Sequence, residues 1–272
     1  MIADMHPNVT VRLFLMLEIR STRKDTPDIV SSNKNYTKRE TNIPEGRSYF
    51  MSSDVNFEIA PSILSADFCC LLDEIKQVEG HAKYLHIDVM DGHYVPNISF
   101  GIPVINKIRP HTDMIFDVHL MITNPEEFIE KFAKVGADAI TFHIECTDDP
   151  KALIDKIHSL GKRAGIAIHP DTPVEKVFPY LKDLEIVLLM SVIPGLGGQK
   201  FMEEAPSRLK TIREELDRVG SKALLSVDGG IHTQTIETAV GSGARLLVAG
   251  SAVFDTPDHG KAVEDLKCAV NL

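Results

Sequence analysis

The sequence predicts an α/β protein that forms a (β/α)8 TIM barrel, a closed ring of eight parallel strands with the helices outside. Eight short apolar segments recur at intervals of roughly 20–30 residues, a spacing that suits repeated strand–helix units. Most of them are separated by stretches with apolar residues at positions i, i+3 and i+4, which is typical of amphipathic helices. The apolar segments are also nearly continuous, as in parallel strands that are covered on both faces.

The strand candidates follow one another in chain order from residue 57 onward. They are FEIAPS (57–62), YLHIDV (84–89), MIFDVHL (114–120), AITFHI (139–144), RAGIAI (163–168), EIVLLMS (185–191), ALLSVD (223–228) and RLLVAG (245–250). Clear helical stretches between them cover residues 125–135 and 150–160. Glycine opens the triplets Gly136-Ala137-Asp138 and Gly243-Ala244-Arg245, each directly before a strand, and a glycine in this place is typical of a helix C-cap.

An open, doubly wound sheet is the alternative that the same alternation permits. Such a sheet normally carries a glycine-rich fingerprint after its first strand. The segment PSILSADF at residues 61–68 contains no glycine, so the closed barrel is favoured. In a barrel the carboxyl ends of all strands face one common mouth, and polar residues at those ends are the candidates for a site.

Length and charge set the domain organisation of the 272-residue chain. The net charge is −10 and no basic stripe occurs, which argues against a nucleic-acid partner. No apolar stretch is long enough to span a bilayer, so no membrane partner is expected. Residues 1–50 lack sustained periodicity and hold more Lys and Arg than Asp and Glu, unlike the rest. We expect residues 1–50 to be a disordered or untranslated extension and residues 51–272 to form a single catalytic barrel domain.

The cysteines indicate the compartment. Cys69, Cys70, Cys146 and Cys268 show no C-x-x-C spacing, and the adjacent pair is poorly placed to form a disulfide. A metal site built from them is therefore not expected. A reduced protein in the cytoplasm is the prediction.

Polar residues at the strand ends predict a metal site. His86 and Asp88 are two apart on the second strand, so both side chains point to the same face. The third strand offers His119 and the seventh offers Asp228. Two imidazoles and two carboxylates at one mouth form an N₂O₂ set that suits Zn²⁺, Mn²⁺, Fe²⁺ or Co²⁺. For His86 and Asp88 alone, a structural hydrogen bond between them is the alternative.

For other residues near this mouth the sequence gives weaker evidence of a role in the site. His143, at the end of the fourth strand, is best explained as a buried core histidine because nothing else marks it out. Asp117 faces the same way as the third-strand histidine but one layer deeper, where a hydrogen bond is favoured over ligation. Three methionines also end strands here: Met90, Met121 and Met190. Their thioethers would form an apolar cover over the metal, although ordinary core filling explains them equally well.

Glycines after the last three strands predict a phosphate site. The segments are Gly195-Leu196-Gly197-Gly198, Gly229-Gly230 and Gly250-Ser251. Glycine lets backbone N–H groups approach an anion closely. The loops after strands seven and eight are also the customary phosphate site of this fold. One such pair can be a simple turn, but three at successive strand ends favour a phosphorylated ligand.

Six segments, in order, resemble the ribulose-phosphate 3-epimerase family. They are PSILSADF (61–68), HIDVMDGHYVPN (86–97), DVHLMI (117–122), MSVIPGLGGQKF (190–201), VDGGI (227–231) and VAGSAVF (248–254). The similarity runs from about residue 57 to the C-terminus without large gaps. Residues 1–50 have no counterpart in it.

The resemblance implies a role for each matching position. His86, Asp88, His119 and Asp228 would be the metal ligands, and the two aspartates would also be the acid/base pair, one on each face of the substrate. Substrate would be bound by Ser62, His119, Gly195, Leu196, Gly197, Gly198, Asp228, Gly229, Gly230, Gly250 and Ser251. The capping residues would be Met90, Met121 and Met190.

The activity that the resemblance implies is a step of the pentose phosphate pathway in carbohydrate metabolism. A metal-dependent ketose-phosphate 3-epimerase would interconvert D-ribulose 5-phosphate and D-xylulose 5-phosphate by two-base proton transfer at C3 through an enediolate. One divalent metal ion, Zn²⁺ first among the four candidates, would stabilise the developing charge. An allulose-6-phosphate 3-epimerase would use the same residues, and a non-catalytic phosphosugar-binding barrel is the alternative from another class. A homo-oligomer is also implied.

Four positions depart from the family pattern. A polar residue is usual where this chain has Ile193, and phenylalanine where it has Leu196. His169 and His232 stand where asparagine is common in bacterial members. The metal and acid/base set is intact, so these differences bear on closure of the loop after the sixth strand and on sugar preference.

Overall fold

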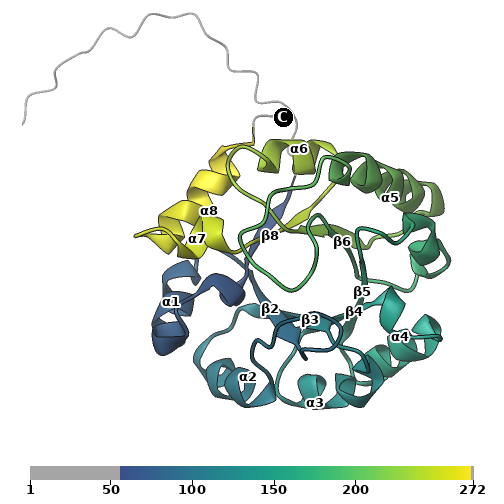
Figure 1. Cartoon of the computed structure of the whole chain (residues 1–272), viewed down its shortest axis with the longest axis horizontal. Coiled ribbons are helices and arrows are strands. Elements are labelled where there is room, and N and C mark those ends of the chain that lie inside the picture. Colours follow the sequence, from purple (N-terminus) through teal and green to yellow (C-terminus); the bar gives the residue numbers. More distant parts are fainter. Residues whose placement is uncertain (1–55, 271–272) are drawn as a thin grey trace, which may run out of the picture. The chain divides into compact units, whose positions relative to one another are not determined.

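The computed structural model describes residues 56–270, and eight strands alternate there with helices that surround them (Figure 1). The strands are β1 (Glu58–Pro61), β2 (Tyr84–Met90), β3 (Ile115–Met121), β4 (Ala139–His143), β5 (Arg163–Ile168), β6 (Ile186–Met190), β7 (Leu224–Asp228) and β8 (Leu246–Ala249). The helices are α1 (Leu71–Val78), α2 (Ile102–Ile108), α3 (Ile129–Lys134), α4 (Pro150–Ser159), α5 (Ala205–Val219), α6 (Ile236–Gly241), α7 (Ser251–Phe254) and α8 (His259–Cys268). The extension predicted at residues 1–50 lies outside the described residues.

All eight strands belong to one parallel sheet, which confirms the predicted (β/α)8 barrel. Their order is β1-β8-β7-β6-β5-β4-β3-β2, so from β2 to β8 each strand pairs with its neighbours in the chain, and β1 pairs with β8. Between β1 and β2 the described residues form no ladder, and an isolated parallel bridge joins Ser62 to His86. This bridge is the seam at which the ring closes.

The observed strands begin and end within two residues of the predicted ones, and the differences have local causes. Ser62, predicted as the end of the first strand, instead caps a short 3-10 turn (Ile63–Ser65), because its hydroxyl accepts a hydrogen bond from the N–H of Leu64. The helix predicted at residues 125–135 begins with a separate 3-10 turn at Pro125–Glu127. Between β5 and β6 a 3-10 helix (Val174–Tyr180), which contains Pro179, takes the place of an α-helix.

Two apolar layers hold the barrel together. Alternate residues of each strand point inward, where small and branched side chains such as Ala60, Ala167 and Leu246 fill the ring. The residues between them point outward and pack on the helices, with Leu85 and Phe116 among them. Strands buried on both sides explain the nearly continuous apolar runs of the sequence.

The strand register decides which polar groups meet at the mouth. On β2 and β3 it places His86 beside Asp117 and Asp88 beside His119. On β6 and β7 it places Met190 beside Asp228. All these residues occupy inward positions of their strands, with His86 and Asp117 one layer deeper than Asp88 and His119, so the barrel directs them towards one another. Within residues 56–270, no helix combines the length and the apolar character needed to cross a membrane.

Candidate functional site

The structure brings the four predicted metal ligands together. One donor atom from each of His86, Asp88, His119 and Asp228 lies within 4.8 Å of the others. The carboxylate of Asp88 is 3.3 Å from His86 Nε2 and 3.2 Å from His119 Nδ1. The carboxylate of Asp228 is 3.9 Å from the former nitrogen and 3.8 Å from the latter. Three strands, β2, β3 and β7, therefore supply one compact donor cluster.

The donor cluster fits a divalent cation. His86 Nε2 is completely buried, faces the cluster and has no hydrogen-bond partner within the described part of the chain. A buried polar atom without a partner is costly, and a ligand to a cation is the role that removes this cost. Two neutral imidazoles and two carboxylates are the donor types that Zn²⁺ and related cations prefer. The predicted ligand set therefore suits the metal by chemistry as well as by proximity.

Asp117 holds the other side of His86. Its Oδ2 lies 2.9 Å from His86 Nδ1, so the ring donates that N–H to the carboxylate and presents Nε2 to the cluster. Asp117 is not one of the clustered donors, as the sequence predicted from its deeper position. Burial by itself favours a neutral imidazole, but the charge of Asp88 and the hydrogen bond of Asp117 outweigh it and raise the pKa of His86.

The two aspartates of the cluster titrate in opposite directions. Burial favours the neutral acid at Asp88, but the charge of His86 and the proximity of the His119 ring outweigh it, so its pKa lies well below the ordinary value. Burial and then the charge of Asp88 raise the pKa of Asp228 to about 6. One carboxylate is therefore firmly ionised, while its neighbour can hold a proton near neutral pH.

Ser62 fixes the position of the ionised carboxylate. Its hydroxyl donates a hydrogen bond of 2.5 Å to Asp88 Oδ2, and the other carboxylate oxygen is the one that faces both histidines. Both residues are buried. The bond joins the end of β1 to β2 across the seam of the ring, next to the Ser62–His86 bridge.

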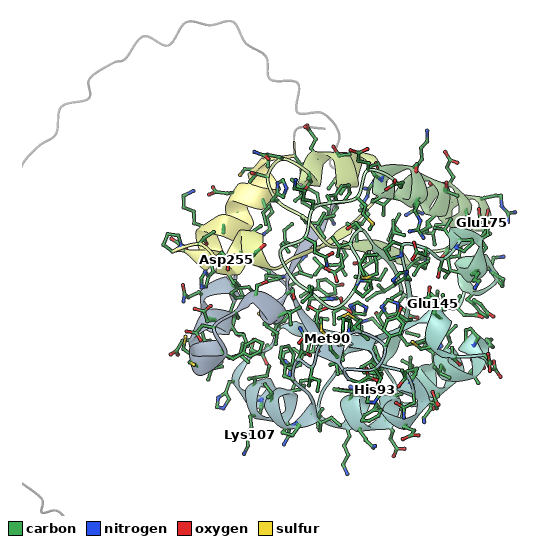
Figure 2. The ribbon with its side chains drawn as sticks, viewed as in Figure 1. Met90, His93, Lys107, Glu145, Glu175 and Asp255 are labelled. Atoms are coloured by element: carbon green, nitrogen blue, oxygen red, sulfur yellow. The ribbon has the colours of Figure 1, made fainter. Side chains whose placement is uncertain are left out.

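A cavity of about 360 Å³ opens above the cluster. Its lining includes all the predicted site residues except the two histidines, which are buried beneath it. Met90, Met121 and Met190 line it as predicted and are nearly inaccessible to solvent. Met90 lies near the centre of the ring of helices, whereas Lys107 and Glu175 lie at the outer edge (Figure 2).

Glycines form one side of the cavity because side chains would not fit there. Gly230 has a φ of +64°, and a Cβ at this position would lie 2.3 Å from the backbone nitrogen of Phe201. A Cβ on Gly250 would lie 2.5 Å from the hydroxyl of Ser65. Gly250 also precedes the short helix α7, which begins at Ser251. At these positions the cavity is lined by backbone without side chains, the kind of surface that an anion can approach closely.

The loop after β6 borders the cavity on another side. Gln199 braces it by donating from its side-chain amide to the carbonyls of Ile193 and Leu196, at 2.6 and 2.9 Å. Asn97, from the loop after β2, donates to the carbonyl of Gly195 at 3.1 Å. The side chains of Ile193 and Leu196 themselves are exposed. Of these two apolar departures from the family pattern, Leu196 also lines the cavity, whereas Ile193 does not.

Some contributions to the site were missed from the sequence. Ser65 and Lys200 also line the cavity. Ser65 lies in the PSILSADF segment, whose polar residues were the available signal.

His143 was interpreted from the sequence as a core histidine. It is fully buried and is not one of the clustered donors, but its Nε2 lies 2.9 Å from His119 Nε2. Burial lowers the pKa of His143 to about 4, so this ring is neutral at neutral pH.

Comparison with known sequences finds close similarity to one family. Residues 58–254 match the model of the Ribulose-phosphate 3 epimerase family. The ribulose-phosphate 3-epimerase of Bacillus subtilis (strain 168) is 46% identical over 212 residues, which cover 77% of this chain and 98% of that protein. The ribulose-phosphate 3-epimerase, cytoplasmic isoform, of Oryza sativa subsp. japonica is 42% identical over 225 residues, covering 81% of this chain and 97% of the relative.

Comparison with solved structures supports the architecture. A 3-hexulose-6-phosphate synthase aligns with a TM-score of 0.55 at 18% identity, covering 78% of this chain and 98% of that chain. The orotidine 5′-phosphate decarboxylase of Pyrococcus horikoshii OT3 aligns with a TM-score of 0.59 at 14% identity, again covering 78% and 98%. At such identities the likeness shows the fold alone.

Proposed function

Because this chain belongs to the ribulose-phosphate 3-epimerase family and is an epimerase, we propose that it interconverts D-ribulose 5-phosphate and D-xylulose 5-phosphate. The reaction inverts C3, the carbon next to the keto group. We propose that it is metal-dependent and uses two carboxylates as alternate acid and base. The substrate is thus a small ketose phosphate.

One observation carries the proposal: two carboxylates and two imidazoles from three strands meet at the floor of one cavity. A binding protein for phosphosugars needs the glycine loops, but it has no need of two close carboxylates whose pKa values lie on opposite sides of the ordinary value. Such a pair is what proton removal and proton return require. The geometry therefore favours catalysis over binding alone.

His86, Asp88, His119 and Asp228 would hold the metal. A divalent cation there acts as a Lewis acid and stabilises the negative charge that develops on the substrate oxygens next to C3. Zn²⁺ is the first candidate, with Fe²⁺, Mn²⁺ and Co²⁺ as the alternatives. Asp117 orients His86 for this role through its hydrogen bond to Nδ1.

Asp88 and Asp228 would divide the proton transfer. Asp88 has the lowered pKa and is held by Ser62, so it is ionised and oriented to accept the C3 proton of one epimer. Asp228, with a pKa of about 6, can deliver a proton to the planar intermediate. Delivery to the face opposite to removal inverts C3. In the reverse reaction the two residues exchange roles.

The remaining residues would bind the substrate and exclude water. Met90, Met121 and Met190 offer an apolar, aprotic surface next to the reaction centre, so the intermediate cannot take a proton from solvent on the wrong face. Gly195, Leu196, Gly197, Gly198, Gly229, Gly230, Gly250 and Ser251 line the cavity and are proposed to bind the phosphate end. Lys200 also lines the cavity and adds a positive charge that suits this assignment.

Deuterium wash-in from D₂O at C3 tests the proposal. We expect the metal-loaded protein to exchange the C3 hydrogen of ribulose 5-phosphate and to form xylulose 5-phosphate. A chelator should stop both, and Zn²⁺, Fe²⁺, Mn²⁺ or Co²⁺ should restore them. Faster exchange with allulose 6-phosphate would move the assignment to the six-carbon sugar. If neither sugar exchanged its C3 hydrogen with any of these metals, the protein would be a non-catalytic phosphosugar-binding barrel.

The proposal extends to the compartment, the oligomeric state and the partners of the protein. We propose that the protein works in the cytoplasm as a homo-oligomer with no nucleic-acid or membrane partner. The rice relative is named as a cytoplasmic isoform, which supports this compartment for the chain. The four cysteines are free thiols, in keeping with a reduced protein.

A further inference from the structure

His119 is held on both sides. Its Nδ1 faces the carboxylates of Asp88 and Asp228, and its Nε2 lies 2.9 Å from His143 Nε2. The planes of the two rings are inclined by 27°, and their centroids are 5.0 Å apart. At a separation of 2.9 Å one nitrogen must donate a hydrogen and the other must accept it.

The requirement for a ligand decides which nitrogen donates. To bind a cation through Nδ1, His119 must keep a lone pair there and carry its hydrogen on Nε2. His143 Nε2 must then accept, which leaves the hydrogen of a neutral His143 on Nδ1. The opposite arrangement would put a hydrogen on His119 Nδ1, between the ring and the cation.

The surroundings of His143 Nδ1 favour the arrangement that ligation needs. Two oxygens lie there: the hydroxyl of Tyr94 at 2.8 Å and Oε2 of Glu145 at 3.2 Å. A carboxylate can only accept, so Glu145 favours the hydrogen on His143 Nδ1. Burial opposes ionisation of Glu145, but its hydrogen bonds with His143, with Thr172 and with the N–H of His169 together outweigh burial and lower its pKa to about 2, so its negative charge persists at neutral pH.

Glu145 is itself fixed from the other side. Its Oε1 accepts a hydrogen bond of 3.0 Å from the backbone N–H of His169. Arg208, on α5, donates to the carbonyls of His169, Pro170 and Thr172 at 3.1, 2.6 and 2.5 Å. A guanidinium on α5 therefore holds the loop after β5, and this loop holds the carboxylate.

We infer that His143 and Glu145 are positioning residues of the metal site: they fix the hydrogen of His119 on Nε2 and so present its Nδ1 to the cation. The inference rests on the proposed metal function. Each histidine ligand would then be oriented by a buried or half-buried carboxylate. Asp117 contacts His86 directly, whereas Glu145 acts on His119 through the ring of His143. This inference also replaces the interpretation of His143 as a core residue.

Zn²⁺ affinity of the metal-free full chain, measured by competition with a chromophoric chelator, tests the inference. His143→Phe keeps an aromatic ring but removes both nitrogens, and we expect the dissociation constant to rise about 10- to 100-fold. His143→Gln keeps an acceptor and a donor, so its constant should stay close to that of the original chain. Glu145→Gln should give an intermediate loss.

Glu185→Gln is the matched control. Glu185 also pairs with a histidine, His158, at 3.0 Å and also accepts a backbone N–H, from Ala164, at 2.8 Å. It precedes β6, at the opposite end of the strands from the cavity. The same substitution there should leave Zn²⁺ affinity unchanged, and the melting temperatures of the metal-free variants will show whether each remains folded.

A second measurement does not depend on any variant. Long-range ¹H–¹⁵N spectra of the histidine-labelled, Zn²⁺-loaded chain should place the hydrogen of His119 on Nε2 and that of His143 on Nδ1. A hydrogen on His143 Nε2 in that spectrum would overturn the inference.

The outcomes separate the two proposals. Tight Zn²⁺ binding by the original chain with equal affinity in His143→Phe and Glu145→Gln would overturn the positioning role alone. An equal loss in Glu185→Gln would overturn it too, because the effect would then be a general one on stability. No binding of any of the four metals to the original chain would remove the metal site and, with it, the role of His143.

Discussion

At the scale of residues, the site depends on two carboxylates that share one environment and still differ in proton affinity. Asp88 accepts a hydrogen bond from Ser62 and lies beside the charge of His86, and both favour its charged form. Asp228 is buried beside the charge of Asp88, and its pKa rises to about 6. Neighbouring groups thus shift the pKa values of two chemically identical side chains in opposite directions.

Asp88→Asn and Asp228→Asn should each abolish turnover without unfolding the barrel. An amide cannot accept the C3 proton and is a poor ligand, so kcat should fall about 10²- to 10⁴-fold or more. Steady-state kinetics with both epimers and circular dichroism will measure the two properties. Asp265→Asn, on the surface helix α8, is the control. Near-normal activity in either site variant would refute the two-carboxylate assignment.

Asp228→Asn should also stabilise the metal-free protein at pH 8. The folded state raises the pKa of Asp228 from 3.8 to about 6, so its ionised form is disfavoured by folding above about pH 6. Removing the charge should add about 1–3 kcal/mol to the free energy of unfolding. The gain should shrink as the pH falls from 6 to about 4, where the original side chain binds a proton in the folded state. Urea unfolding with a chelator present would measure it; a pH-independent difference would contradict the mechanism.

The clustering of the four donor residues could be predicted from the sequence, but the hydrogen bonds that orient them could not. His86 and Asp88 share a strand face by simple alternation, and the barrel brings His119 and Asp228 to them. The partner of His119 was not predictable, because His143 follows from the register between neighbouring strands and from ring orientation. An isolated histidine on an apolar strand carries no sign of either.

At the scale of elements, strands were easier to predict than helices. The eight apolar runs mark strands that are buried on both faces, and each was found within two residues of its predicted ends. Helical stretches are shorter than their apolar periodicity suggests, since proline and local side-chain caps divide them into 3-10 and α segments, as at Pro125–Glu127. The glycine loops could be recognised by composition, whereas the braces of Gln199 and Asn97 depend on tertiary contacts.

Leu196→Ala tests the loop after β6 as a cover for the ligand. The side chain is 62% exposed without ligand, so its removal should change the melting temperature by less than about 1 °C. If the loop closes on the substrate, the lost apolar contact should raise KM several-fold. The loss of binding free energy cannot exceed about 1.5–3 kcal/mol, the value for full burial of a leucine side chain. Ile98→Ala is the control, because Ile98 is 75% exposed and does not line the site cavity. An unchanged KM would show that the loop does not cover the ligand with this residue.

At the scale of the whole molecule, the fold class, the family and the enzyme class predicted from the sequence are confirmed. The identity of the metal and the oligomeric state stay predictions. Both depend on properties outside one chain: the cations available to it, and the surfaces of its partners.

A chain that starts at Met51 should match the full chain in melting temperature and turnover. The strand that opens the barrel begins at Glu58 and pairs along its length with β8, so the ring needs no earlier residue to complete it. Calorimetry and steady-state kinetics on both chains will test this. A drop in melting temperature of several degrees would show that residues 1–50 contribute to the folded barrel.

The seam between β1 and β2 has a consequence for how the barrel fluctuates. There the ring is joined by the Ser62–His86 bridge and by the hydrogen bond from Ser62 to Asp88, so the groups that we propose for the reaction also close the sheet. Any occupant that orders these groups will slow hydrogen–deuterium exchange of the backbone amides of both strands. Local opening of the barrel is thereby linked to ligand binding in the cavity, and the exchange rates of the β1 amides will show whether the cavity is occupied.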